Sequence, residues 1–161
     1  MHIESTRRQF VSRAAIGAMS SMPFVLRGQA PDRKIRLGLI GCGWYGMVDT
    51  EAAFKVGGVE VAAICDVDRE HLREAADKIE ARQGARPKTF GRYEELLLVP
   101  ELDAVIIATP PQWHALQLIA AVKRNLDVYC EKPLAYDIRE CRAMADAVKA
   151  SGRIVQVGFQ R

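Results

Sequence analysis

Residues 35–46 read Ile-Arg-Leu-Gly-Leu-Ile-Gly-Cys-Gly-Trp-Tyr-Gly, and this stretch decides the fold. The mostly apolar residues 35–40 predict a buried strand, and Gly41, Gly43 and Gly46 follow with the spacing G-x-G-x-x-G. In such a turn the first glycine permits a sharp bend, the second lets the backbone approach a pyrophosphate, and the third lets the next helix pack closely on the strand. The N-terminus of that helix attracts the anion. The stretch therefore predicts a dinucleotide-binding turn, with a purely structural turn as the alternative.

A second apolar run, residues 59–65, ends at Asp66, where a ribose-binding carboxylate belongs after such a turn. A carboxylate there accepts a hydrogen bond from the ribose 2′-OH and repels a 2′-phosphate. We therefore predict NAD as the cofactor, with NADP as the alternative because Arg69 lies close enough in sequence to soften the preference. Asp66 could instead serve only to cap the turn or the following helix.

The rest of the chain alternates between predicted helices and strands. After residues 59–65, strands are predicted at 88–90, 103–108, 126–130 and 154–159, and helices at 44–56, from the cap Asp68 onward, at 92–99, 112–124 and 138–150. Apolar residues recur at helical spacing in the helix after Asp68 (Leu72, Ala75, Ala76, Ile79) and in the last helix (Ile138, Cys141, Ala145, Val148). This order predicts an α/β fold with a doubly wound parallel sheet, the Rossmann architecture.

Composition and charge set wide bounds. The chain has 161 residues, of which 49% are hydrophobic and 27% charged, as in ordinary globular proteins. The net charge of +3 comes from residues 1–30, which hold four arginines and one glutamate, and the remainder is balanced. This balance gives no reason to expect nucleic acid or an anionic membrane as a partner.

Residues 1–30 have the pattern of a secretory signal. Ser5-Thr-Arg-Arg-Gln-Phe-Val11 places the pair Arg7 and Arg8 before a moderately apolar stretch, which the small residues Gly28-Gln-Ala30 follow. The pattern predicts recognition by the twin-arginine translocase (Tat) and a periplasmic or secreted protein. The stretch is too short and too interrupted to span a membrane. Pro31 disfavours cleavage after Ala30, and a chance Arg-Arg pair is the alternative reading. Residues 31–161 then form the nucleotide-binding domain.

The four cysteines, Cys42, Cys65, Cys130 and Cys141, form neither a C-x-x-C pair nor a zinc-binding spacing. We therefore predict buried thiols and no metal site. The Tat pathway carries folded proteins, so the domain needs no disulfide and a cofactor can be bound before export.

Two further motifs follow predicted strands: Thr109-Pro-Pro-Gln-Trp-His114 and Glu131-Lys-Pro133. Together with the glycine turn, Asp66 and Val157-Gly-Phe-Gln-Arg161, they make residues 34–161 resemble the Gfo/Idh/MocA family of NAD(P)-dependent oxidoreductases. The resemblance implies hydride transfer between NAD(P) and a small sugar or polyol. It also implies a homo-oligomer and a second α/β domain beyond Arg161, with an Asp and a His that work with Lys132. We therefore expect this chain to be the nucleotide-binding part of a larger protein.

The resemblance also assigns roles to residues. Lys132 is the expected catalytic residue, and Pro133 resembles a family proline that is often cis. Lys132 could alternatively be a solvated turn lysine, His114 a structural residue and Tyr45 a packing residue. The full predicted cofactor-binding set is Gly41, Gly43, Trp44, Tyr45, Gly46, Asp66, Thr109, Pro110, His114, Glu131 and Lys132.

Three functions remain open at this stage. The first is an exported oxidoreductase, and the second is an exported glycosidase of the same family that uses bound NAD in a transient oxidation and elimination. The third is a non-catalytic nucleotide-binding fragment. Turnover without net NADH production would distinguish the second from the first.

Overall fold

The computed structural model describes residues 33–159, so the predicted leader 1–30 and residues 160–161 lie outside the described part. The strands are β1 (Ile35–Ile40), β2 (Val59–Cys65), β3 (Lys88–Phe90), β4 (Ala104–Ile107), β5 (Asp127–Glu131) and β6 (Val155–Gly158). The helices are α2 (Trp44–Val56), α3 (Arg69–Gln83), α4 (Tyr93–Leu96), α5 (Pro111–Lys123) and α6 (Ile138–Ser151).

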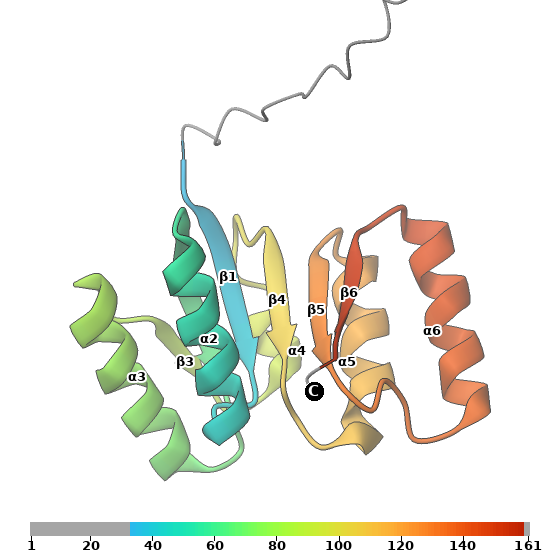
Figure 1. The fold of residues 1–161 in the computed structure, drawn as a ribbon, viewed down its shortest axis with the longest axis horizontal. Coiled ribbons are helices and arrows are strands. Elements are labelled where there is room, and N and C mark those ends of the chain that lie inside the picture. The colour runs from blue at the N-terminus through green and yellow to red at the C-terminus, as the bar shows by residue number, and fades with distance from the viewer. Residues whose placement is uncertain (1–32, 160–161) are drawn as a thin grey trace, which may run out of the picture. The chain divides into compact units, whose positions relative to one another are not determined.

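The strands form one parallel sheet in the order β3-β2-β1-β4-β5-β6. Their carboxyl ends all point to the lower edge in Figure 1, where each crossover begins. The order reverses direction between β1 and β4, which is the switch point where doubly wound sheets bind ligands. The predicted α/β class and doubly wound sheet are confirmed.

Apolar side chains from the strands form a core on each face of the sheet. Leu39, Ile64 and Ile106 pack with α3 and the partly buried side of α2. On the other face, Ile40, Val105 and Ile107 pack with apolar side chains of α4, α5 and α6. Leu118 of α5 and Met144 of α6 belong to this second core. Because adjacent residues of a strand enter opposite cores, the central strands read as continuous apolar runs.

Two local predictions need correction. The helix predicted at 92–99 extends only over Tyr93–Leu96, with turns up to Pro100. In α6 the predicted apolar face is wrong at three of its four positions, since Ile138, Cys141 and Ala145 are exposed. Val148 does pack against the core, beside the buried Met144. The helix packs mainly against α5, so only a narrow stripe around Met144 is buried. Figure 1 shows it beside α5 and β6.

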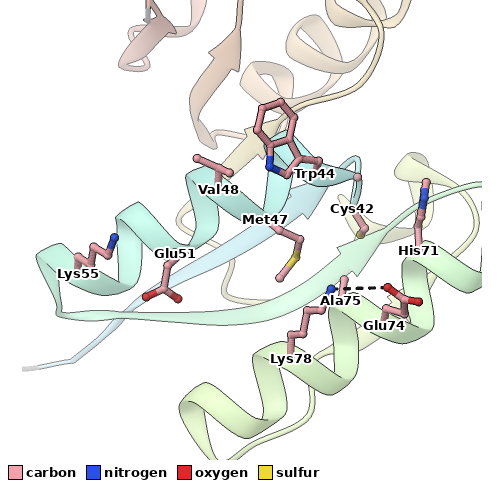
Figure 2. Close-up of a pocket in the computed structure, with 11 residues that line it drawn as sticks. Cys42, Trp44, Met47, Val48, Glu51, Lys55, His71, Glu74, Ala75 and Lys78 are labelled. Atoms are coloured by element: carbon pink, nitrogen blue, oxygen red, sulfur yellow. Dashed lines mark ion pairs between the residues drawn. The ribbon is translucent and has the colours of Figure 1, made fainter.

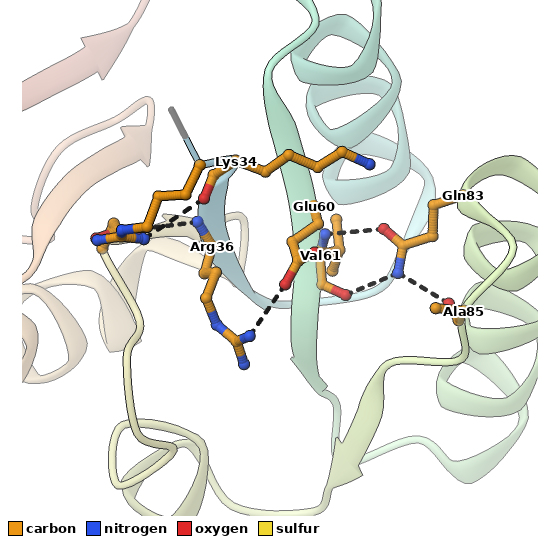
Figure 3. A network of polar contacts seen from close by, with 8 residues as sticks. Lys34, Arg36, Glu60, Val61, Gln83 and Ala85 are labelled. Carbon is orange, nitrogen blue, oxygen red and sulfur yellow. Dashed lines mark hydrogen bonds and ion pairs between the residues drawn. The ribbon is translucent and has the colours of Figure 1, made fainter. Parts of the chain in front are cut away.

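The amino ends of the central strands are held by charged side chains. The Arg33 guanidinium makes two hydrogen bonds to the Asp103 carboxylate, of 2.7 and 2.6 Å, and Asp103 also accepts the Arg36 N–H at 2.8 Å. These donors hold the pKa of Asp103 below its ordinary value, with the Arg33 hydrogen bond as the largest cause. Arg36 in turn pairs with Glu60 at 3.1 Å, which joins β1 to β2 (Figure 3).

A glutamine completes the exposed edge of β2. Strand β3 pairs only with Ala63, Ile64 and Cys65, so Val61 extends beyond it. The Gln83 amide accepts the Val61 N–H at 2.9 Å and donates to the Val61 carbonyl at 3.0 Å and to Ala85 at 2.8 Å (Figure 3). The side chain thus supplies the bonds that a longer strand would make.

Within residues 33–159, no helix is long and apolar enough to cross a membrane, and no group of His, Cys, Asp and Glu could hold a metal ion. The cysteines are free thiols, and three are buried as predicted, whereas Cys141 is exposed. Burial raises the pKa of Cys65 and of Cys130 to about 12, so these thiols stay protonated at neutral pH.

Candidate dinucleotide-binding site

The three glycines after β1 differ in what surrounds them. Gly41 has a φ of +96°, and a Cβ there would lie 2.7 Å from the Ala108 carbonyl oxygen. A Cβ on Gly46 would overlap the Gly41 carbonyl, so the helix could not approach the strand. A Cβ on Gly43 would meet nothing within 4 Å. The open space over Gly43 is therefore a cradle in which another molecule can touch the backbone, as a pyrophosphate does in this motif.

The start of α2 supplies the positive potential that such a group needs. Gly43 caps the helix without a side-chain hydrogen bond, and the first turn carries no acidic residue. The first N–H groups of a helix have no intrahelical acceptor, and the helix dipole adds partial positive charge there. The residues at this helix start therefore suit the binding of a dinucleotide phosphate.

Asp66 ties the glycine turn to the end of β2. One carboxylate oxygen accepts the Cys42 N–H at 2.7 Å, and the other accepts the Asp68 N–H at 2.9 Å. An ionised carboxylate offers about four lone-pair sites, so these two bonds leave capacity for a ribose hydroxyl. Asp66 therefore holds the turn before α3, whose N-cap is Asp68, and it also lines the cavity described next, so its ribose role stays a prediction.

A cavity of about 590 Å³ lies over the carboxyl ends of β1, β2, β3 and β4. Cofactor pockets span roughly 300–1,000 Å³, so its size suits part of a dinucleotide. From the predicted set, the lining includes Gly41, Gly43, Asp66, Thr109 and Pro110. Several lining residues were not selected from the sequence, among them Arg92, Tyr93, Trp113 and Gln117. Two signals were present in the sequence, because Arg92 lies two residues after the end of β3 and Trp113 belongs to the Thr109–His114 motif.

His114 lies beside this cavity but does not line it. Its imidazole is fully buried (0% exposed), with Nε2 2.7 Å from the Thr109 carbonyl oxygen and Nδ1 2.9 Å from the Pro133 carbonyl oxygen. This placement favours the structural alternative for His114. It also links the loop that walls the cavity to the turn that carries Lys132.

The turn after β5 gathers Tyr45, Glu131 and Lys132. The Lys132–Pro133 peptide bond is cis, as the resemblance implied. The exposed Lys132 places its Nζ 5.7 Å from the centroid of the Tyr45 ring, at cation–π distance, and its N–H donates to Glu131 at 3.2 Å. Tyr45 therefore contacts the predicted catalytic lysine, beyond the packing role considered for it.

Glu131 is buried at 5% exposure against a second carboxyl group, that of Asp49 on α2. Burial raises the pKa of Asp49 to about 6, and the charge of Glu131 and a hydrogen bond between the two carboxyls add to this. The Tyr129 hydroxyl donates a hydrogen bond of 3.4 Å to the Glu131 carboxylate. Sequence reasoning missed Asp49, because an acidic residue inside an exposed helix carries no signal of its partner.

Trp44 packs edge-on against Tyr45, with the two ring centroids 5.1 Å apart. It is 80% exposed and borders a different cavity of about 510 Å³ between α2 and α3. Figure 2 shows Met47, Cys42 and Ala75 among the residues that line it, with Glu74 and Lys78 forming an ion pair of 3.6 Å along α3. The structure therefore brings the predicted residues together in two groups, one around the glycine turn and one at the end of β5.

The strand order, the glycine turn and the cavity define a dinucleotide-binding Rossmann domain. Residues 35–159 match the family described as "Oxidoreductase family, NAD-binding Rossmann fold", GFO_IDH_MocA. The chain belongs to this Gfo/Idh/MocA oxidoreductase family, and its cofactor is NAD.

Similar proteins include enzymes of two kinds. The chain is 36% identical over 132 residues to inositol 2-dehydrogenase 4 of Saccharopolyspora erythraea, covering 81% of this chain and 38% of the relative. It is also 36% identical over 131 residues to a glycosyl hydrolase family 109 protein of Stenotrophomonas maltophilia, covering 78% and 29%. The chain thus spans about a third of the length of these curated relatives.

Among solved structures, the WlbA dehydrogenase of Bordetella pertussis, in complex with NADH and UDP-GlcNAcA, is 34% identical. It superposes with a TM-score of 0.68 over 79% of this chain and 35% of that one.

Proposed function

We propose that this chain is the nucleotide-binding part of an exported oxidoreductase that transfers hydride between NAD and a hydroxyl of a sugar or polyol. The carrying observation is that His114 joins the cavity loop at Thr109 to the Glu131-Lys-Pro133 turn. The same contacts therefore hold both the loop that lines the cofactor cavity and the turn that carries Lys132, the candidate proton-transfer group. The likeness to inositol 2-dehydrogenase 4 supports a polyhydroxylated substrate.

Bound NAD supplies the hydride acceptor. The Lys132 amine hydrogen-bonds the substrate hydroxyl and takes its proton as the hydride leaves the same carbon, which converts the alcohol to a carbonyl. The exposure of Lys132 leaves its amine reachable by a substrate. The Tyr45 ring stabilises the protonated amine through its π face.

The remaining parts of the proposal concern the protein outside the described residues. The Arg7–Arg8 pattern supports export through the Tat machinery. The resemblance supports a second domain that completes the substrate site and a homo-oligomer. In both curated relatives the matching region makes up 29–38% of the chain.

One observation favours a second candidate, an NAD-dependent glycosidase. The Stenotrophomonas maltophilia relative carries the name glycosyl hydrolase family 109 protein. In that reaction, oxidation at one sugar carbon acidifies the neighbouring C–H, elimination breaks the glycosidic bond, and water addition with re-reduction completes hydrolysis. The cofactor returns to its starting state.

Turnover assays on the complete protein test both candidates. With NAD and a panel of sugars and polyols, the oxidoreductase produces one NADH for each hydroxyl oxidised. The glycosidase releases sugar from a glycoside without net NADH. Lys132→Ala should abolish most of either activity, whereas Lys34→Ala, an exposed lysine just before the opposite end of β1, should not. Full activity in the Lys132 variant would contradict the proposed role.

A further inference from the structure

Helix α2 contacts the end of β5 through two side chains that lie one helical turn apart. Tyr45 and Asp49 are four residues apart on α2 and therefore share one face of the helix. The Tyr45 ring centroid lies 5.7 Å from the Lys132 Nζ, and the Asp49 carboxyl group is hydrogen-bonded to that of Glu131. One face of α2 thus contacts two consecutive residues, Glu131 and Lys132, where the candidate proton-transfer group is carried.

The two carboxyl groups differ in the donors around them. Glu131 accepts the Tyr129 hydroxyl at Oε1 and the Lys132 N–H at Oε2, at 3.4 and 3.2 Å. Oδ2 of Asp49 is buried, and no donor within residues 33–159 reaches it. A hydrogen bond between two carboxyl groups needs one O–H, and a buried oxygen without donors disfavours the charged form. The shared proton therefore belongs on Asp49, with Glu131 as the acceptor.

The Glu131 side chain is confined from the opposite side by β6. It is 5% exposed, and Glu131 pairs with Gly158 across the sheet. A Cβ on Gly158 would overlap both Oε1 of Glu131 and the Tyr129 hydroxyl, so these two groups fill the space that the glycine leaves. Close packing transmits displacements. A change at Asp49 therefore reaches the Glu131 carboxylate and, through its bond to the Lys132 N–H, the turn.

We propose that Asp49 is a positioning residue, whose protonated carboxyl group donates a hydrogen bond to the Glu131 carboxylate and thereby sets where the Lys132 turn lies against α2. Loss of the Asp49 proton leaves two carboxylates in contact, which repel each other. The effect of this placement on turnover rests on the proposed function of Lys132, but the placement itself does not.

The surroundings of the carboxyl pair make this placement depend on pH. Burial is the largest cause that raises the pKa of Asp49, to about 6, and the charge of Glu131 adds to it. The other ionisable groups that face the pair are Tyr129 and Lys132 at the end of β5 and Tyr45 on α2. Strands β1, β2 and β4, which also pack against α2, contribute apolar side chains to that face of the sheet. The turn should therefore shift as the pH rises through about 6.

Carbon-13 NMR of the full chain tests this placement directly. The carboxyl carbon of Asp49, assigned with Asp49→Asn, should titrate with a midpoint near pH 6. Lysines are reductively methylated with ¹³C, and the Lys132 signal, assigned with Lys132→Arg, should move with the same midpoint. An Asp49 carboxyl group already ionised well below pH 6, or a Lys132 signal without this step, would overturn the proposal.

Two substitutions separate the hydrogen bond from the charge. Asp49→Asn keeps an N–H donor toward Glu131 at every pH, so the Lys132 signal should stay at its low-pH position without a step near pH 6. Asp49→Ala removes the donor, so the signal should be displaced from that position throughout. A step that persists in the Asn variant, or an unchanged signal in the Ala variant, would contradict the coupling.

Glu51→Gln is the matched control on the same helix. It also removes a carboxylate from α2, but on the side that faces α3, where Glu51 pairs with Arg82 at 3.6 Å. The Asp49 titration and the Lys132 signal should be unchanged in this variant. A shift as large as that of Asp49→Ala would show a general effect of charge on α2 and would contradict the specific role of Asp49.

Turnover is measured separately in the complete protein. Asp49→Ala should lower kcat by roughly tenfold to a hundredfold through misplacement of Lys132, and Asp49→Asn should restore most of the loss. If the NMR signals behave as expected while kcat is the same in all three proteins, the placement holds and the proposed function of Lys132 is wrong.

Discussion

The two ends of the parallel sheet use polar groups in opposite ways. At the amino ends, Arg33 and Asp103 bond to each other and Gln83 saturates the edge of β2. At the carboxyl ends, the backbone at Gly43 faces open space, and Asp66 turns toward a cavity. The same strands therefore end in mutual pairing on one side and in groups that can receive a ligand on the other.

The direction of the strands explains this difference. In a parallel sheet every crossover helix starts at the carboxyl end, so helix N-termini with free N–H groups gather there. Helix C-termini and return loops lie at the amino ends, where charged side chains such as Arg33 and Asp103 stabilise the fold by pairing with each other. Substitutions at the carboxyl end should therefore affect binding and chemistry, and those at the amino end only stability.

The largest contrast is expected between two lysines. In the complete protein, Lys132→Ala should lower kcat by roughly 10²–10⁴-fold, the usual effect of losing a positioned acid–base group. NAD affinity should change far less, and Lys34→Ala at the amino end should leave kcat unchanged. Steady-state kinetics with calorimetric NAD titration measure both quantities, and a near-normal kcat for the Lys132 variant would remove the contrast.

The glycine turn divides further into structural and ligand-facing positions. Gly46→Ala should lower the free energy of unfolding by about 1–3 kcal/mol, because the added methyl overlaps the Gly41 carbonyl. Gly43→Ala adds a methyl to open space and should lower it far less. Denaturant unfolding of both variants checks this, and equal losses would show that the space over Gly43 is not open.

Asp49 and Asp103 should respond to pH with opposite signs. The pKa of Asp49 is raised to about 6 in the folded protein, above the ordinary value of about 3.9. Its contribution to stability is therefore present below pH 4 and is lost as the pH rises through 6. Asp49→Asn should thus be more stable relative to the wild type at pH 7.5 than at pH 4.5, by less than about 2 kcal/mol after allowing for its partial exposure.

The pKa of Asp103 is lowered instead, so its stabilisation is present above the ordinary pKa and is lost as the pH falls. Asp103→Asn should cost about 0.2–1 kcal/mol at pH 7, because Arg33 is largely exposed, and the cost should shrink at low pH. Urea unfolding across this pH range measures both variants. The same pH trend in both would refute the opposed roles of the two carboxylates.

The sequence predicts the parts of this site that depend on local order. The strand before Gly41, the glycine spacing and Asp66 are all readable because their chemistry depends on neighbours within one crossover unit. Arg92 and Trp113 also line the cavity, but only the sheet order brings their loops beside the glycine turn. Their positions near strand ends were readable from the sequence, but that they share one cavity with Gly41 was not.

Contacts between different crossover units could not be predicted from the sequence. The Asp49–Glu131 pair joins α2 to β5, and the His114 bridge joins α5 to a turn 19 residues away. The buried face of α6 was mispredicted for the same reason. The helix packs against α5, and the position of α5 cannot be read from the spacing of apolar residues in α6. Each case depends on tertiary packing that residue spacing does not encode.

The most direct test of the account is calorimetric titration of the full chain with NAD, for the wild type, Gly43→Ala and Asp103→Asn. The account predicts one NAD per chain, an affinity at least about tenfold weaker in Gly43→Ala, equivalent to about 1.4 kcal/mol, and an unchanged affinity in Asp103→Asn. No NAD binding by the folded wild type, or equal affinity in Gly43→Ala, would contradict the assignment of the cofactor to the carboxyl end of the sheet.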